Sequence, residues 1–185
     1  TDSLDIAEDY MIQTLYENKV ISSILGSSHD DLISFSKIRL LFRHNHEDVN
    51  AETIVDLYRD SGLTKAILFV PGLFCDETLW MKVSDEDTGL GDHFLNKGYF
   101  PIYIRYNQGA HISVNGKDLN ELLKKLFELE PNLPLSVITY SQGGLVLRST
   151  LYYAKQESAA YLSQIQKVFI ISSPNGGSYI EKIGF

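Results

Sequence analysis

The chain has 185 residues, of which 44% are hydrophobic and 22% are charged, and its formal net charge is −8. This composition excludes a disordered, highly charged chain, and the length suits one domain or one domain with an appendage. The net charge is −7 over residues 1–60, and no cluster of Lys and Arg offers a phosphate-binding surface, so we expect no nucleic-acid partner.

Signals of redox compartment and targeting are sparse. The single cysteine, Cys75, excludes an internal disulfide framework and supplies too few thiols for a zinc site. No apolar run approaches the roughly 20 residues that cross a bilayer. No basic-then-apolar signal peptide opens the sequence, which starts at Thr1 rather than Met. We therefore expect a reducing, cytoplasmic location.

Residues 1–62 are predicted to form a helical N-terminal segment. The spacing of apolar residues favours a helix over 6–25, and residues 51–62 are typical of a short helix closed by Gly62. The stretch 28–44 is ambiguous, because part of it alternates as in a strand while an acidic pair near its start suits the first turn of a helix. We interpret the acidic charge of the segment as a solvated helical face rather than a docking surface.

Residues 63–185 have a different character. Four short apolar runs are predicted to be strands, over residues 66–70, 101–106, 135–139 and 167–173. A stripe of leucines predicts a helix over 119–129, and the SQGG turn after the third run opens another helix. Short apolar runs that alternate with helices indicate βαβ units. The predicted fold class is therefore α/β, with a mostly parallel sheet that is buried on both faces.

The stretch VITYSQGGLVLRST places Ser141 directly after a buried strand and before a helix. This is the setting of a nucleophile elbow, a turn so tight that the residues two before and two after the serine should be small. Gly143 meets this demand, whereas Thr139 is larger. A serine held in such a turn should show positive φ and expose its Oγ at the carboxyl edge of the sheet. The alternative is an ordinary strand-to-helix turn with the serine as N-cap.

Three further stretches resemble the α/β-hydrolase lipases and esterases, and in particular some bacterial lipase-like hydrolases. The first strand and oxyanion loop of that family are similar to ILFVPGL, in which Pro71 replaces the usual histidine. Two later segments of the family resemble RYNQGAHISVNGKDLNELL and ISSPNGGS. The resemblance covers about residues 65–182. It implies the first part of an α/β-hydrolase core, with about four strands, over residues 63–185.

Carried over residue by residue, the resemblance makes Ser141 the nucleophile and Gly143 the small residue of its elbow. One oxyanion donor would be the backbone N–H of Gln142, and the second that of Leu73, with Phe74 as the next choice. Several apolar side chains are candidates for lining a substrate pocket, and for the last two a plain core role explains them at least as well: Leu73, Phe74, Trp80, Leu145 and Val146. The resemblance implies no cofactor.

The sequence supplies no evident base for Ser141. A serine hydroxyl needs a histidine to take its proton and an acid to orient that histidine, and in this fold both follow the serine in the chain. After Ser141 there is no aspartate and no histidine, and Glu157 and Glu181 carry the only carboxylates. All five histidines precede it: His29, His44, His46, His93 and His111.

None of these histidines is a strong candidate from the sequence. His111 lies in a matched stretch, where we interpret it as structural rather than catalytic. The pair His44 and His46 has a spacing that can ligate a metal, but no acidic or cysteine cluster accompanies it, so no metal site is expected. Two explanations then compete. Either the chain ends before the strands that carry the acid and the histidine, which we favour, or the fold is kept and the chemistry lost.

The sequence thus predicts a serine hydrolase that cleaves carboxylic esters, lipase-like or esterase-like, through an acyl-enzyme on Ser141. Its expected partner is a small-molecule ester or lipid, and contact with a membrane surface is compatible with such a substrate. Acyl transfer to an acceptor other than water would use the same residues, and the oligomeric state is left open. The alternative is a catalytically inactive α/β-hydrolase-like binding domain. If the triad is incomplete here, this chain alone should show little esterase activity.

Overall fold

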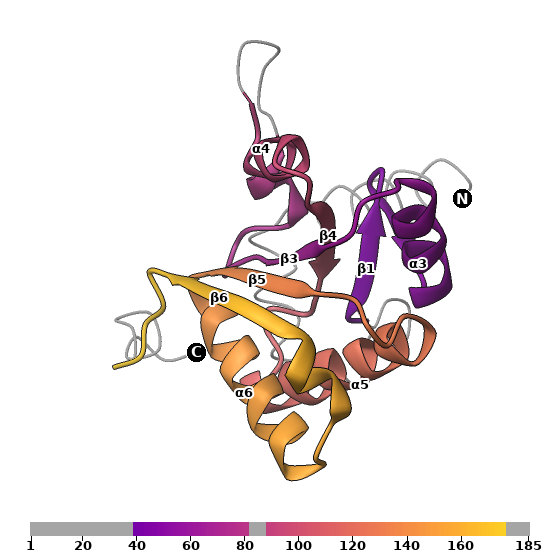
Figure 1. Cartoon of the computed structure of the whole chain (residues 1–185). Coiled ribbons are helices and arrows are strands. Elements are labelled where there is room, and N and C mark those ends of the chain that lie inside the picture. The colour runs from indigo at the N-terminus through magenta and orange to yellow at the C-terminus, as the bar shows by residue number, and fades with distance from the viewer. Residues whose placement is uncertain (1–38, 82–87, 177–185) are drawn as a thin grey trace, which may run out of the picture.

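The structure, a computed structural model, describes residues 39–81 and 88–176. The helix predicted over 6–25 lies outside these residues. The described chain forms one six-stranded sheet in the order β2-β1-β4-β3-β5-β6, with helices on both of its faces (Figure 1). The fold class is therefore α/β, as the sequence predicted, and the sheet is larger by two strands than the apolar runs indicated.

The four predicted strands form the parallel part of the sheet. Their observed bounds are β3 (Ala66–Val70), β4 (Phe100–Arg105), β5 (Leu135–Tyr140) and β6 (Ile165–Ile171). β3 pairs in parallel with both β4 and β5, and each of its five residues has an exposure of 0%. A parallel strand covered on both faces needs apolar side chains at every position, which explains the unbroken run AILFV.

Helices cover both faces of this parallel part. α3 (Ala51–Asp60), α5 (Ile112–Leu129) and α6 (Gln142–Gln156) pack on the face to which Leu68 and Val70 point. α4 (Leu90–Asn96) and the 3-10 turn η1 (Glu77–Trp80) cover the face of Ile67 and Phe69. A second 3-10 turn, η2 (Ala160–Gln164), leads from α6 into β6. No helix within the described ranges is long and apolar enough to span a membrane.

The sequence does not decide between helix and strand over 28–44, and the expectation of a helical segment up to residue 62 is wrong for the described part before α3, which contains two strands. β1 (Leu41–His44) and β2 (Glu47–Val49) form a hairpin, and β1 also pairs antiparallel with β4. Asn45 and His46 have φ values of 50° and 66°, which is the signature of a two-residue type I′ turn.

The helix predicted over 51–62 is confirmed as α3. Asn50 caps its first turn by accepting a hydrogen bond from the Thr53 N–H at 2.9 Å, and Gly62 follows its end with a φ of 67°. The boundary between two domains after residue 62 stays a prediction, although β1 and β2 join the same sheet as the later strands.

Candidate active site

Ser141 lies at the junction of β5 and α6, with φ 50° and ψ −121°. The predicted positive φ is confirmed. A residue with a Cβ in such a conformation stores about 1–3 kcal/mol of strain, which the surrounding structure must hold. The Ser141 N–H donates to the Ile171 carbonyl at 2.8 Å, and its carbonyl accepts from the Gly144 N–H at 3.1 Å. The turn is therefore fixed both by β6 and by the first residues of α6.

The alternative of an ordinary N-cap is wrong. An N-cap serine has an extended backbone and accepts a hydrogen bond from an amide of the first helical turn. Ser141 has neither property, because its φ is positive and its side chain makes no capping hydrogen bond. Its hydroxyl is thus not used to stabilise the helix start, which is the condition for using it in chemistry.

Two glycines allow the neighbouring strands to approach this turn. A Cβ at Gly143 would lie 2.5 Å from the Pro71 carbonyl oxygen and 2.6 Å from that of Val70. A Cβ at Gly144 would lie 2.7 Å from the Ser173 hydroxyl oxygen. A side chain at Gly143 would therefore meet the backbone at the end of β3, whereas one at Gly144 would require the Ser173 side chain to shift.

The predicted reason for the small residue at 143 needs correction. The tightness of the elbow predicts small residues at 139 and 143, yet the three atoms nearest to a Cβ at Gly143 all belong to Val70 and Pro71. Thr139 is fully buried, and its hydroxyl lies 3.4 Å from the Phe169 carbonyl oxygen, to which it donates. Because its side chain turns toward β6, threonine is compatible with the elbow.

The loop after β3 lies directly against Ser141. A Cβ at Gly72 would lie 2.8 Å from the Ser141 Cβ and 2.9 Å from the Tyr140 carbonyl oxygen, so only glycine permits this approach. The Cys75 N–H donates back to the Gly72 carbonyl at 3.1 Å, and Phe74, third of the four residues, has a φ of 61°. This is the pattern of a type II turn with a non-glycine residue in its strained position.

The turn distinguishes the two candidates for the second oxyanion donor. The Phe74 N–H donates to the Gln108 Oε1 at 2.8 Å and is therefore occupied. Within residues 39–81 and 88–176, the N–H groups of Leu73 and Gln142 have no hydrogen-bond partner. For Gln142 this follows from its place as first residue of α6, because the first amides of a helix lack an intrahelical acceptor. The oxyanion roles of both amides stay predictions.

The predicted pocket-lining residues fall into two groups. Phe74 is 36% exposed, and Leu145 is half-buried. Trp80 and Val146 are buried in the core, and the Trp80 ring packs 5.2 Å from that of Phe69. Trp80 Nε1 has no hydrogen-bond partner in the described part of the chain. The surroundings of Trp80 and Val146 are those of core side chains, and their role as pocket lining stays a prediction.

No histidine within the described ranges forms a hydrogen bond with Ser141. His111 is exposed and precedes α5, whereas His44 and His46 belong to the β1–β2 hairpin. His93 lies on α4, where its ring packs 5.9 Å from that of Phe94. Among the described residues, no group of three or more His, Cys, Asp or Glu side chains is arranged to hold a metal ion.

The carboxylate of Glu157 is engaged elsewhere. Glu157 follows the last residue of α6, at the end opposite to Ser141. It accepts hydrogen bonds from Lys124 and Asn120, each at 3.0 Å, and these bonds, that of Lys124 first, hold its pKa below the usual value. Glu181 lies outside the described residues. The acid and the base of a triad are therefore not identified.

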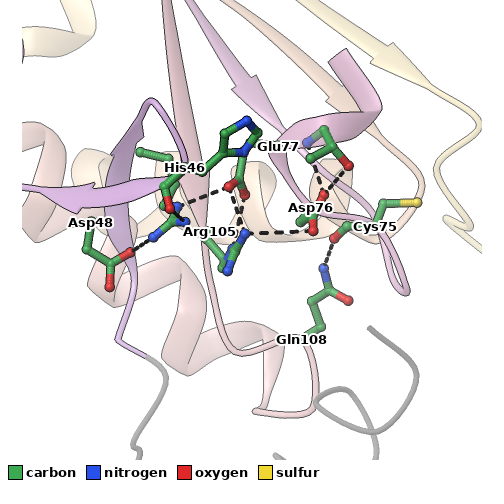
Figure 2. Close-up of polar contacts among 9 residues, drawn as sticks. His46, Asp48, Cys75, Asp76, Glu77, Arg105 and Gln108 are labelled. Atoms are coloured by element: carbon green, nitrogen blue, oxygen red, sulfur yellow. Dashed lines mark hydrogen bonds and ion pairs between the residues drawn. The ribbon is translucent and has the colours of Figure 1, made fainter. Parts of the chain in front are cut away.

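An ion cluster that the sequence did not reveal anchors the far end of the loop after β3. Glu77, with an exposure of 0%, accepts a hydrogen bond from Arg43 Nε at 3.1 Å and two from Arg105, at 3.0 and 2.7 Å (Figure 2). Arg43 also binds the Asp48 carboxylate and the His46 carbonyl oxygen. Glu77 thus ties η1 to β1 and β4, and removal of one partner of such a buried pair typically costs about 3–5 kcal/mol.

The connection after β4 supplies two more contacts that the sequence did not reveal. The Tyr106 hydroxyl donates to the Pro71 carbonyl oxygen at 2.8 Å and lies 3.3 Å from the Gln142 Oε1. Burial raises the pKa of Tyr106 far above its ordinary value, and the nearby Cys75 raises it further, so the hydroxyl keeps its proton. Gln108, two residues on, contacts the loop after β3 and accepts from Gln142. A tyrosine and a glutamine in a loop carry no local signal for these partners.

Comparison with known proteins bears on the fold. No protein-family model matches the chain, and no curated protein matches it. Among solved structures, it is similar to the propeptide form of the lipase BlEst2 from Bacillus licheniformis, with a TM-score of 0.53 and 21% identity over 66% of this chain and 25% of that one.

The mature form of the same lipase gives a TM-score of 0.49 and 20% identity over 65% of this chain and 50% of that one. The chain thus spans about a quarter of the propeptide form and about half of the mature form. The parallel sheet, the strained serine between β5 and α6, and the likeness to the propeptide form lead to one conclusion. The chain has an α/β-hydrolase-like fold.

Proposed function

We propose that the protein is a carboxylic ester hydrolase, lipase-like or esterase-like, in which Ser141 forms the acyl-enzyme. The observation that carries the proposal is the backbone of Ser141, which is held at φ 50° beside Gly72 while its hydroxyl makes no capping bond. Such strain persists where the structure over-determines it, and it concentrates at active sites.

The chemistry proposed for the site has two half-reactions. The Ser141 Oγ attacks the ester carbonyl carbon and gives up its proton, and the carbonyl oxygen becomes an oxyanion that accepts from the Leu73 and Gln142 N–H groups. Collapse of this intermediate expels the alcohol, which takes up a proton, and leaves an acyl group on Oγ. Water then attacks the acyl-enzyme, which releases the carboxylic acid and restores the serine.

The proton transfers require a base and an acid that the described residues do not bring to Ser141. Because the chain spans only 25% of the propeptide form of the lipase that it resembles, we propose that further strands of a longer protein carry them. A small-molecule ester with a lipid-like acyl group is the proposed substrate class.

Hydrolysis of a short-chain aryl ester by the native full-length protein tests the proposal. Ser141→Ala should abolish turnover, whereas Ser163→Ala, which removes an exposed hydroxyl in η2, should leave it unchanged. Equal rates for the Ser141→Ala variant and the wild type would overturn the assignment of the nucleophile.

One observation favours a second candidate, a catalytically inactive binding domain. None of the histidines within the described ranges forms a hydrogen bond to Ser141. If the full-length wild type shows no turnover of aryl esters under conditions in which a control lipase is active, this second candidate is preferred.

A further inference from the structure

Gln108, in the connection between β4 and α5, bridges the two halves of the candidate oxyanion site. Its Oε1 accepts from the Phe74 N–H at 2.8 Å, and its Nε2 donates to the Cys75 carbonyl oxygen (Figure 2). Its own backbone carbonyl accepts from the Gln142 Nε2 at 3.1 Å. One residue thus contacts both the loop after β3 and the residue that follows the candidate nucleophile.

Gln108 contacts the part of the loop after β3 whose backbone conformation is least favoured by its own residues. A type II turn differs from a type I turn by rotation of its central peptide, here the peptide between Leu73 and Phe74. The positive φ of Phe74 disfavours the observed orientation, because its Cβ then crowds the backbone. A side-chain amide supplies one acceptor and one donor together, which are the two groups that this turn requires at Phe74 and Cys75.

Occupation of the Phe74 amide also selects the donor that faces a substrate. With the Phe74 N–H bound to Gln108 and the Cys75 N–H bound to Gly72, the Leu73 N–H is the one of these three consecutive amides without a partner in the described part of the chain. The bond between Gln142 and the Gln108 carbonyl keeps the same connection aligned with the start of α6.

We propose that Gln108 is the positioning residue of the oxyanion site, which holds the Leu73 and Gln142 amides in register for one developing oxyanion. This inference rests on the proposed ester hydrolysis at Ser141. Gln108 itself does not contact the reacting atoms, and it acts through the turn that it holds.

The first test measures amide hydrogen exchange of Phe74 in the native full-length protein. Gln108→Ala removes the acceptor of the Phe74 N–H, so exchange of this amide should accelerate about tenfold, as expected for the loss of one neutral hydrogen bond. Gln166→Ala, which removes an exposed side chain of β6, should leave it unchanged. Unchanged exchange in a folded Gln108→Ala variant overturns the inference.

The second test separates kcat from KM in aryl ester hydrolysis. Oxyanion contacts form in the transition state, so Gln108→Ala should lower kcat about tenfold or more with little change in KM. A fall of less than twofold, or a loss confined to KM, overturns the inference while the proposed function stands. An inactive wild type overturns the proposed function, whatever Gln108→Ala does to the exchange of Phe74.

Gln108→Glu gives a readout that a purely structural role would not move. An ionised glutamate can accept from the Phe74 N–H, but it cannot donate to the Cys75 carbonyl and adds negative charge near the oxyanion. A protonated glutamate has both the acceptor and the donor of the original amide. The ratio of the kcat of Gln108→Glu to that of the wild type should therefore rise as the pH falls toward the range in which carboxylates protonate. A ratio that is constant with pH overturns the inference.

Discussion

β3 in the middle of the sheet and β6 at its edge are both apolar strands, but their side chains are covered to different extents. β3 is paired on both sides, and its five residues have an exposure of 0%. β6 is also apolar, but it is the last strand of the described sheet, and Val168 to Ile171 are between 38% and 45% exposed.

The candidate site lies on loops that follow β3 and β5, two strands that are each paired on both sides. The loop with Leu73 follows β3, and the elbow with Ser141 follows β5, which lies between β3 and β6. Ser141 and Phe74 both have positive φ, and such strain persists where the surrounding structure over-determines it. The comparison teaches that an apolar run predicts a strand, whereas the position of the strand in the sheet decides how far its side chains are covered.

The largest effect is expected where a charge is buried next to the site. Glu77→Gln should lower the free energy of unfolding by about 3–5 kcal/mol, because it leaves Arg43 and Arg105 without their shared carboxylate. The exposed Glu128→Gln is the matched control and should change it by less than about 0.5 kcal/mol. Urea unfolding measures both, and equal midpoints would contradict the anchoring role of Glu77.

A truncation in each strand sharpens the comparison itself. Leu68→Ala in β3 should cost about 2–5 kcal/mol, since the cavity would be enclosed on all sides. Ile170→Ala in β6 should cost about 1 kcal/mol in the 185-residue chain, because its side chain is 39% exposed there. Chemical denaturation measures the free energy of unfolding of both variants. Equal decreases would show that Ile170 is as buried in solution as Leu68.

Adding a methyl group at Gly143 tests whether the end of β3 packs closely against the elbow. Gly143→Ala should destabilise the fold by about 1–3 kcal/mol and abolish ester hydrolysis, since its Cβ would meet the Pro71 carbonyl oxygen at 2.5 Å. Gly176→Ala is the control, because a Cβ there meets no atom of the described residues within 4 Å. Thermal unfolding and turnover are the measurements. A fully active, equally stable Gly143→Ala variant would contradict the described elbow.

The smallest effect is expected at the end of α6 that is remote from the site. The pKa of Glu157 is lowered by its bonds to Lys124 and Asn120. A depressed folded-state pKa contributes stability above the unfolded-state pKa, and this contribution is lost as the pH falls through the folded-state value. Between about pH 6 and pH 3, the wild type should thus lose slightly more stability than Glu157→Gln. The difference should shrink with added salt, because the pair is exposed. An equal acid dependence would show that the pair contributes nothing.

Local patterns in the sequence predicted much of this architecture. The apolar runs gave β3, β4, β5 and β6 to within two residues, and the small residues after Ser141 predicted its positive φ. These features depend on neighbours along the chain. The β1–β2 hairpin was missed, because its turn uses Asn45 and His46 at positive φ without a glycine.

The support of the candidate site was not predictable in the same way. Glu77 pairs with Arg43 and Arg105 across 34 and 28 residues, and Gln108 reaches Phe74 across 34 residues. No periodicity marks such partners, since they meet only after the strands have paired. α4 was also missed, because its seven residues are too few for a recognisable apolar stripe.

The central claim, that Ser141 is a nucleophile, is tested most directly by mapping a covalent adduct. The native full-length protein is treated with a fluorophosphonate, digested with trypsin and analysed by mass spectrometry, with Ser141→Ala treated in parallel. The account predicts one adduct, on Ser141 in the peptide that ends at Arg148, and none in the variant. An adduct on another serine, or no adduct under conditions that fully label a control lipase, would contradict it.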